Sequence, residues 1–153
     1  MVEPHRILPT IALSWDEMEE VHLPPFQEAV AAGTAMVMSS HVCYPGLGEP
    51  PDLPATFSPR LIRGLLRERF QYEGVIVTDD LEMGALRTFG SVAEAAIRAT
   101  DAGHDLLLIC SDLQAAEEAL ASLRAAYESG RLSQDELQLS VNRLQRLRQT
   151  YLR

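Results

Sequence analysis

Two adjacent carboxylates follow a short apolar segment in the middle of the chain. Asp79 and Asp80 come directly after residues 74–78, a Gly-Val-Ile-Val-Thr run without polar alternation. Such a run is typical of a parallel strand that is buried on both faces. Acidic groups just past the carboxyl end of such a strand lie where α/β enzymes gather their catalytic residues. A carboxylate there could serve as a nucleophile, or it could simply cap the next helix.

A histidine follows a second apolar segment in the same way. His41 comes after residues 35–38 and two serines. Because the carboxyl ends of parallel strands meet at one edge of a sheet, we expect His41 on the same face as the carboxylates. Packing against the proline-rich loop that follows it is a nearly equal alternative. His41 and Cys43 make a poor metal site, because two ligands without a second pair are too few.

Strands and helices alternate around these residues. We expect strands at 35–38, 74–78 and 105–110, and a long irregular loop at 42–59. The expected helices are 14–32, interrupted at the proline pair 24–25, then 60–69, 91–102, 113–129 and 133–153. Serines 14, 91 and 133 each precede a glutamate by three residues, which is the pattern of a capping box. This order predicts right-handed βαβ units and a parallel sheet with unpaired edges, which is a poor independent domain.

Composition narrows the class of protein. The 153 residues suit one domain, and a formal charge of -9 disfavours nucleic acid and anionic membranes as partners. All thirteen basic residues are arginine, which excludes Schiff-base lysine catalysis and the P-loop. Two cysteines make no disulfide framework, so we expect both to be buried or half-buried in a cytoplasmic protein. No apolar run approaches the ~20 residues that span a bilayer.

Several segments resemble glycoside hydrolase family 3, and specifically its bacterial β-N-acetylhexosaminidases. Leu65-Leu66-Arg67, followed after six intervening residues by Gly-Val-Ile-Val-Thr-Asp, is similar to the active-site signature of the family. The other similar segments, in chain order, are 3–5 with 8–9, 35–41, 54–59, 79–83, 130–133 and 140–143. The resemblance implies a (β/α)8 (TIM) barrel, of which residues 1–153 form the last three strands and their helices, with no second domain.

The resemblance also assigns roles to individual residues. Asp79 corresponds to the nucleophile of a retaining glycosidase, which forms a covalent glycosyl-enzyme. His5 corresponds to the acid/base, a task that suits imidazole with its pKa of ~6.5. Glu3 stands where the family has an aspartate that orients this histidine, and Pro4 replaces a serine, so the geometry of this pair can differ from that of the family.

The substrate implied is a terminal N-acetylglucosamine on a cell-wall fragment, with no cofactor. His41, Asp80 and Met83 are the expected substrate-binding residues, although a capping role for Asp80 and helix packing for Met83 remain open. The family motif Lys-His-Phe-Pro-Gly-His-Gly is absent from the chain. The chain therefore has two alternatives to an active fragment, namely a non-catalytic remnant and a βα module that assembles with the missing barrel segment. A receiver-like domain is a disfavoured third candidate, because such domains rely on a lysine near the phosphate acceptor and this chain has no lysine.

Overall fold

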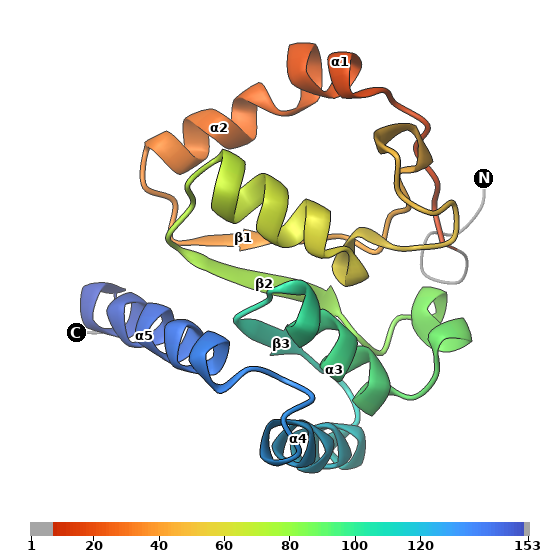
Figure 1. Ribbon diagram of the computed structural model, residues 1–153, viewed down its shortest axis with the longest axis vertical. Helices are drawn as coiled ribbons and strands as arrows, with labels where there is room; N and C mark the ends of the chain where they lie inside the picture. The colour runs from red at the N-terminus through yellow and green to blue at the C-terminus, as the bar shows by residue number, and fades with distance from the viewer. Residues whose placement is uncertain (1–7, 152–153) are drawn as a thin grey trace.

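The computed structural model describes residues 8–151, which form a three-stranded parallel sheet with helices around it (Figure 1). The strands are β1 (Met36–Met38), β2 (Val75–Asp80) and β3 (Leu106–Leu108), in the order β1-β2-β3. The predicted parallel sheet is thus confirmed. Two boundaries were wrong, because β2 continues through both carboxylates and β3 is shorter than expected.

The helices follow the predicted alternation. They are α1 (Trp15–Glu17), η1 (Met18–His22), α2 (Pro24–Ala31), η4 (Arg60–Arg69), α3 (Val92–Ala102), α4 (Leu113–Glu128) and α5 (Gln134–Tyr151), with short turns η2 (Pro45–Leu47), η3 (Ala55–Phe57) and η5 (Gly84–Phe89). η5 was not expected. The expected interruption is present, because η1 ends at His22 and Pro24 then starts α2, where proline's fixed φ and missing N–H suit the first turn.

Two of the predicted capping boxes can be compared directly. At Ser14 both halves form, since its hydroxyl accepts from the Glu17 N–H and the Glu17 carboxylate accepts from the Ser14 N–H. At Ser91 the hydroxyl accepts from the Glu94 N–H, but the Glu94 carboxylate binds Arg131 at 2.8 Å. Arg131, which is distant in sequence, therefore binds the carboxylate that would otherwise complete this capping box.

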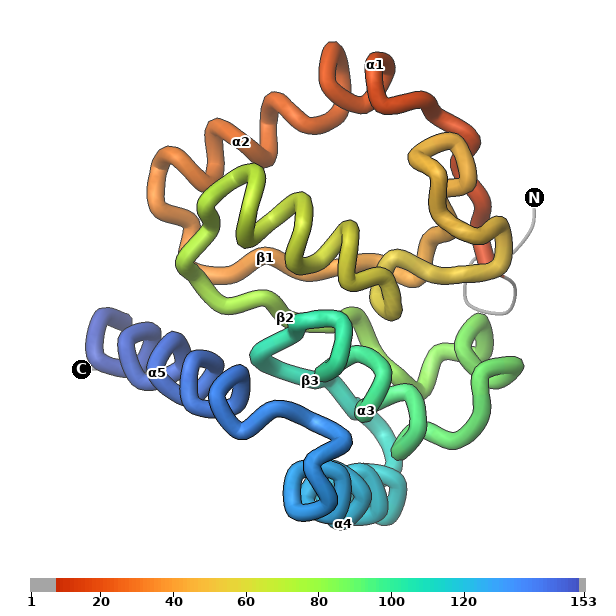
Figure 2. Tube along the Cα trace, viewed as in Figure 1, coloured from red at the N-terminus to blue at the C-terminus, as the bar shows by residue number. Residues whose placement is uncertain are grey.

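Apolar side chains fill the space between the sheet and its helices. Ile76 packs with residues of η4 and α3, while a second cluster joins Phe57, Leu81 and Leu86 to the alanine face of α3. Figure 2 shows α2 and η4 beside β1, with α3 and α4 on the β3 side. α5 lies near the amino ends of the strands, and the proline-rich loop and η5 lie at the carboxyl ends.

The sheet is open. Among residues 8–151, β1 and β3 pair only with β2, apart from isolated bridges outside the named strands. Met36 and Met38 on β1 are 38% and 55% exposed. The structure thus has the three strands and flanking helices expected of an incomplete barrel. No helix in the described part of the chain is both long and apolar enough to cross a membrane.

Buried ion pairs hold the amino edge of the sheet. The side chain of Asp105, at the start of β3, is fully buried. One of its oxygens accepts from Arg67 of η4 and from the Ile76 N–H, and the other accepts from Ser140 and Arg143 of α5. This Asp105 hub therefore joins four elements through one carboxylate.

Candidate active site

The carboxyl end of β2 has an irregular register. Val77 lies opposite Leu106, but Asp80 lies opposite Leu108, so β2 carries one more residue than β3 over this stretch. The Thr78 hydroxyl accepts the Leu108 N–H at 3.0 Å, which satisfies the donor at the irregularity. Such bulges are common beside active sites because they re-aim a side chain.

The two neighbouring carboxylates are held differently. Oδ1 of Asp79 accepts the Asp80 N–H at 2.8 Å, and no described residue donates to its Oδ2. Oδ1 of Asp80 accepts the Glu82 N–H at 3.1 Å, which shapes the turn after the strand. Asp79 is half-buried at the end of the strand. It is therefore a positioned carboxylate with an oxygen left for chemistry, while Asp80 helps to build the loop.

His41 connects the carboxyl end of β2 to the proline-rich loop. The residue is 3% exposed. Its Nε2 lies 2.9 Å from the Asp80 carbonyl, and since a carbonyl has no proton to give, Nε2–H is the donor. Its Nδ1 lies 2.7 Å from Oγ1 of Thr56, which is also 3.0 Å from the Ser40 carbonyl. These contacts fix the backbone of Asp80, and a contact between His41 and substrate stays a prediction.

Glu82 was missed by the sequence analysis. Its two carboxylate oxygens accept the backbone N–H groups of Ser111 at 2.6 Å and of Asp112 at 3.0 Å. The side chain thus bridges the segments that follow β2 and β3. The available signal was a third acidic residue within the Asp-Asp-Leu-Glu-Met segment, three positions after Asp79.

Met83 lies beyond this bridge. Its N–H donates to the Asp80 carbonyl at 3.2 Å. Its half-buried side chain lines a hollow of about 170 Å³ with Leu86 and Val92, at the start of α3. Met83 thus neighbours the next helix, and its proposed substrate contact stays a prediction.

Cys110 lies beside the carboxylates, two residues after the end of β3. The thiol is exposed, so the expectation that both cysteines are buried or half-buried was wrong for Cys110 and correct for Cys43. Desolvation raises the pKa of the Cys110 thiol, and the negative charges of Asp80, Glu82 and Asp79 raise it further. A thiol surrounded by carboxylates stays protonated, because a second negative charge is unfavourable there.

A second buried histidine supports the end of β1. Nδ1–H of His104 donates to the Ala99 carbonyl at 2.9 Å, so Nε2 accepts from the Ser39 hydroxyl at 2.8 Å. Burial lowers the pKa of His104 to about 4. The neutral ring therefore links α3 to the residues that lead to His41. Sequence reasoning gave this histidine no role.

Two predicted residues, Glu3 and His5, lie outside the described residues. Within the described part of the chain, no group of three His, Cys, Asp or Glu side chains is arranged to hold a metal ion. The site that the structure describes is therefore the carboxyl edge around Asp79, Asp80 and Glu82.

Parallel βα units with carboxylates at their carboxyl edge define this chain as a segment of a TIM-barrel-like enzyme domain. A family model, the "Glycosyl hydrolase family 3 N terminal domain", matches residues 1–147. The chain is 34% identical over 137 residues to a β-hexosaminidase of Nitrosomonas eutropha, an alignment that covers 88% of this chain and 38% of that protein. It is 32% identical over 163 residues to β-hexosaminidase A of Pseudoalteromonas piscicida, which covers 96% of this chain and 27% of the relative. This chain belongs to glycosyl hydrolase family 3.

A solved structure agrees with these relatives. The family 3 β-N-acetylglucosaminidase of Paenibacillus sp. str. FPU-7 superposes with a TM-score of 0.92 and 43% sequence identity, covering 97% of this chain and 28% of that one. The expected family and fold are thus confirmed. The chain spans about a quarter to two-fifths of the length of the relatives it matches.

Proposed function

We propose that this chain supplies the nucleophile-bearing part of a retaining exo-β-N-acetylglucosaminidase, which works when the remaining strands of the barrel are present. The supporting observation is the Asp79 carboxylate, held by one oxygen at the carboxyl end of β2 with its second oxygen unengaged by any described residue. The names of the relatives, β-hexosaminidase and β-N-acetylglucosaminidase, support the substrate class. The proposed natural substrate is a cell-wall-derived glycoside with a terminal N-acetylglucosamine.

The proposed reaction has two steps. Asp79 attacks the anomeric carbon while His5, oriented by Glu3, gives a proton to the departing aglycone oxygen. Water then attacks the glycosyl-enzyme and gives its proton to His5, which frees Asp79 and retains the anomeric configuration. In this scheme His41 acts through the Asp80 backbone, which it fixes at 2.9 Å. The proposed substrate contacts are His41, Asp80 and Met83.

The test uses a complete barrel. This chain is fused behind the preceding barrel strands of the Nitrosomonas eutropha relative, and release of 4-nitrophenol from its N-acetyl-β-D-glucosaminide is followed. We expect Asp79→Asn to lower kcat by on the order of 10³-fold or more. Asp101→Asn, the same substitution at an exposed position, serves as the control. An active fusion in which Asp79→Asn keeps the rate of the parent contradicts the assignment.

A second readout separates a nucleophile from a merely structural aspartate. Azide can enter the space that Asp79→Ala leaves, on the face from which the nucleophile attacks. We expect this variant, given azide and an activated substrate, to make the α-configured glycosyl azide. A β-configured product would assign Asp79 to the opposite, acid/base side of the sugar.

The open sheet supports an alternative in which the chain alone is an inactive remnant or a partner-dependent βα module. Both edges of the sheet are unpaired in the described part of the chain. A denaturant titration by circular dichroism decides between the two. A steep single transition of a monomer would argue against dependence on a partner.

The proposal also includes a cytoplasmic location, based on the two free cysteines.

A further inference from the structure

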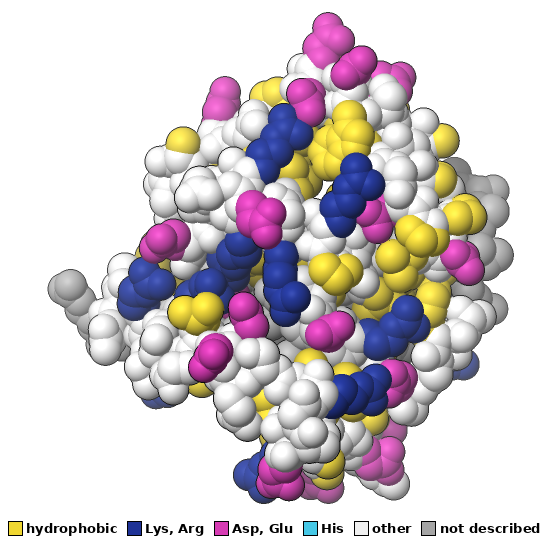
Figure 3. Space-filling view, in the orientation of Figure 1, with side chains coloured by type: hydrophobic (Ala, Val, Ile, Leu, Met, Phe, Trp, Pro, Cys, Tyr) yellow, Lys and Arg dark blue, Asp and Glu magenta, His cyan; other side chains and the backbone are white. Residues whose placement is uncertain are grey.

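A groove with an excess of arginine lies at the amino edge of the sheet, away from the candidate active site. It consists of two hollows of about 380 and 280 Å³, which share residues 71–73, Arg143 and Arg146. Arg67 lines the smaller hollow. Figure 3 shows arginine side chains gathered between α5 and η4, on a protein whose net charge is -9. This groove is therefore a local positive region on an acidic surface.

The charges in the groove are not balanced. Three arginines (67, 143 and 146) meet two carboxylates, Asp105 and Glu73. The Asp105 carboxylate is fully buried and shared by Arg67 and Arg143, whereas the Glu73 side chain is 81% exposed, so water weakens its attraction for Arg146. Among residues 8–151, one positive charge of the groove is therefore unmatched and a second is weakly matched.

The arginines also have donors to spare. Arg67 uses its terminal nitrogens on the carbonyls of Tyr72 and Gly74 and on Asp105. Arg143 and Arg146 each make a single bond to a described residue through one nitrogen. A guanidinium has a planar fork of N–H donors that fits the oxygens of a phosphate or carboxylate.

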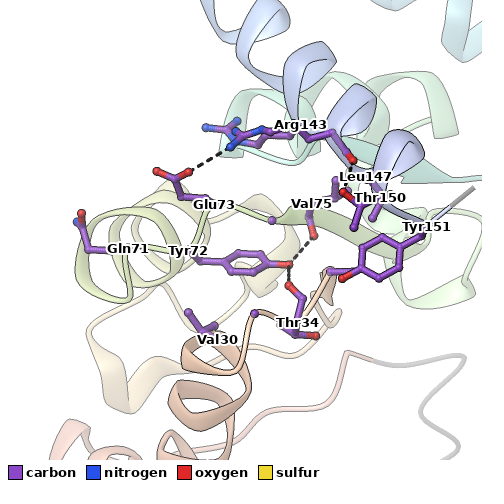
Figure 4. Close-up of a pocket in the computed structure, with 14 residues that line it drawn as sticks. Val30, Thr34, Gln71, Tyr72, Glu73, Val75, Arg143, Leu147, Thr150 and Tyr151 are labelled. Atoms are coloured by element: carbon purple, nitrogen blue, oxygen red, sulfur yellow. Dashed lines mark hydrogen bonds and ion pairs between the residues drawn. The ribbon is translucent and has the colours of Figure 1, made fainter.

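The larger hollow provides a different surface next to these donors. Val30, Val75 and Leu147 line it together with two tyrosines. Figure 4 shows the rings of Tyr72 and Tyr151 and the side chain of Arg143 bordering this space. The Tyr72 hydroxyl lies 3.3 Å from both the Thr34 and the Val75 carbonyls and shares its one proton between them, which fixes its ring, while Tyr151 is 59% exposed at the rim. This end suits a compact apolar or aromatic group.

We propose that this groove binds a small phosphate monoester, with the phosphate against Arg143 and Arg146 and an aromatic or similarly flat body against Tyr151. A phosphate monoester carries about −1.5 to −2 charges at pH 7, which matches the one unmatched and one weakly matched arginine better than a carboxylate does. Burial lowers the pKa of Arg67, the charge of Asp105 opposes this shift, and the charge of Arg143 lowers the pKa further, so an anion beside Arg143 would offset part of the repulsion between the two arginines.

Phenyl phosphate is the probe, with inorganic phosphate and phenol as its two halves. We expect titration calorimetry at low salt to show that phenyl phosphate binds more tightly than inorganic phosphate and that phenol does not bind. Arg146→Gln should lower the affinity for phenyl phosphate by about tenfold, because it removes a charge-assisted contact. Arg148→Gln, with the same charge change at an exposed position of α5 that does not line the groove, should change it less than about twofold.

Tyr151→Ala tests the other end of the groove. It should weaken phenyl phosphate about fivefold and leave inorganic phosphate unchanged, as expected for loss of one stacking contact. The proposal is overturned if phenyl phosphate fails to bind at millimolar concentration, if phenol binds equally well, or if Arg148→Gln matches Arg146→Gln. Equal affinities for phenyl phosphate and inorganic phosphate would also overturn the proposal, because the phenyl ring would then gain no affinity from the larger hollow. Arg146 and Tyr151 lie outside the Asp105 hub, so both variants keep its buried ion pairs.

Discussion

The two edges of the sheet use their carboxylates in opposite ways. At the amino edge, both oxygens of Asp105 accept two donors each, and its side chain is fully buried. At the carboxyl edge, Asp79 is half-buried and accepts one backbone N–H from a described residue. One edge stabilises the fold with a saturated carboxylate, whereas the other keeps a carboxylate available. The carboxylate with four donors thus stabilises the fold, whereas the one with a single described donor is the proposed nucleophile.

The largest expected effect on stability follows from removing the Asp105 carboxylate. Asp105→Ala leaves two partly buried arginines without their carboxylate, which we expect to lower the free energy of unfolding by about 3–5 kcal/mol. Urea titration monitored by circular dichroism measures this loss. Asp101→Ala removes an exposed carboxylate a few residues away and should cost less than about 0.5 kcal/mol. Similar losses in the two variants would show that the hub has no special importance.

The next effect concerns pH and the buried His104. Its pKa is about 4 in the folded protein against 6.5 for the free side chain, so between these values the unfolded chain binds the extra proton. The contribution of neutral His104 to the free energy of unfolding is therefore fully present above pH 6.5. It is lost as the pH drops toward 4, by about 2 kcal/mol between pH 7 and pH 5. Urea midpoints across this range measure the slope.

A variant tests whether His104 is the source of this pH dependence. His104→Gln should be less stable at pH 7, since it cannot replace both bonds of the ring, but its stability should change little between pH 7 and pH 5. An unchanged pH slope in this variant would place the proton uptake elsewhere.

A smaller effect is expected at the carboxyl edge from the bridging glutamate. Glu82→Gln keeps one acceptor oxygen but loses the charge that strengthens the bonds from Ser111 and Asp112, so we expect a loss of about 1–2 kcal/mol. Glu118→Gln, on the exposed surface of α4, is the matched control. If hydrogen exchange at Ser111 and Asp112 is no faster in Glu82→Gln, the bridge does not hold this segment.

The smallest effect on stability is expected where the effect on chemistry is greatest. Asp79→Asn keeps an oxygen that can accept the Asp80 N–H, so the free energy of unfolding should change by less than about 0.5 kcal/mol. A loss as large as that of Asp105→Ala would make Asp79 a structural carboxylate and remove the contrast between the two edges.

Sequence reasoning located the strands because each is an apolar run bounded by a turn or a polar cluster, as the run 75–77 is by Gly74 and by Thr78-Asp79. It placed Asp79 and His41 at one edge because parallel strands share their direction. It could not find the register irregularity before Asp80, which depends on the pairing with β3. Nor could it find Glu82 or His104, whose partners lie 29 and 65 residues away and are brought near only by the fold.

The spacing of the Asp105 hub has a consequence for how the chain is made. Asp105 is 38 residues from Arg67 and 38 from Arg143. During translation Arg67 can reach the aspartate as soon as β3 emerges, whereas Arg143 is still inside the ribosome. The docking of α5 is therefore a late event in synthesis. Until then Asp105 lacks two of its four donors, Ser140 and Arg143.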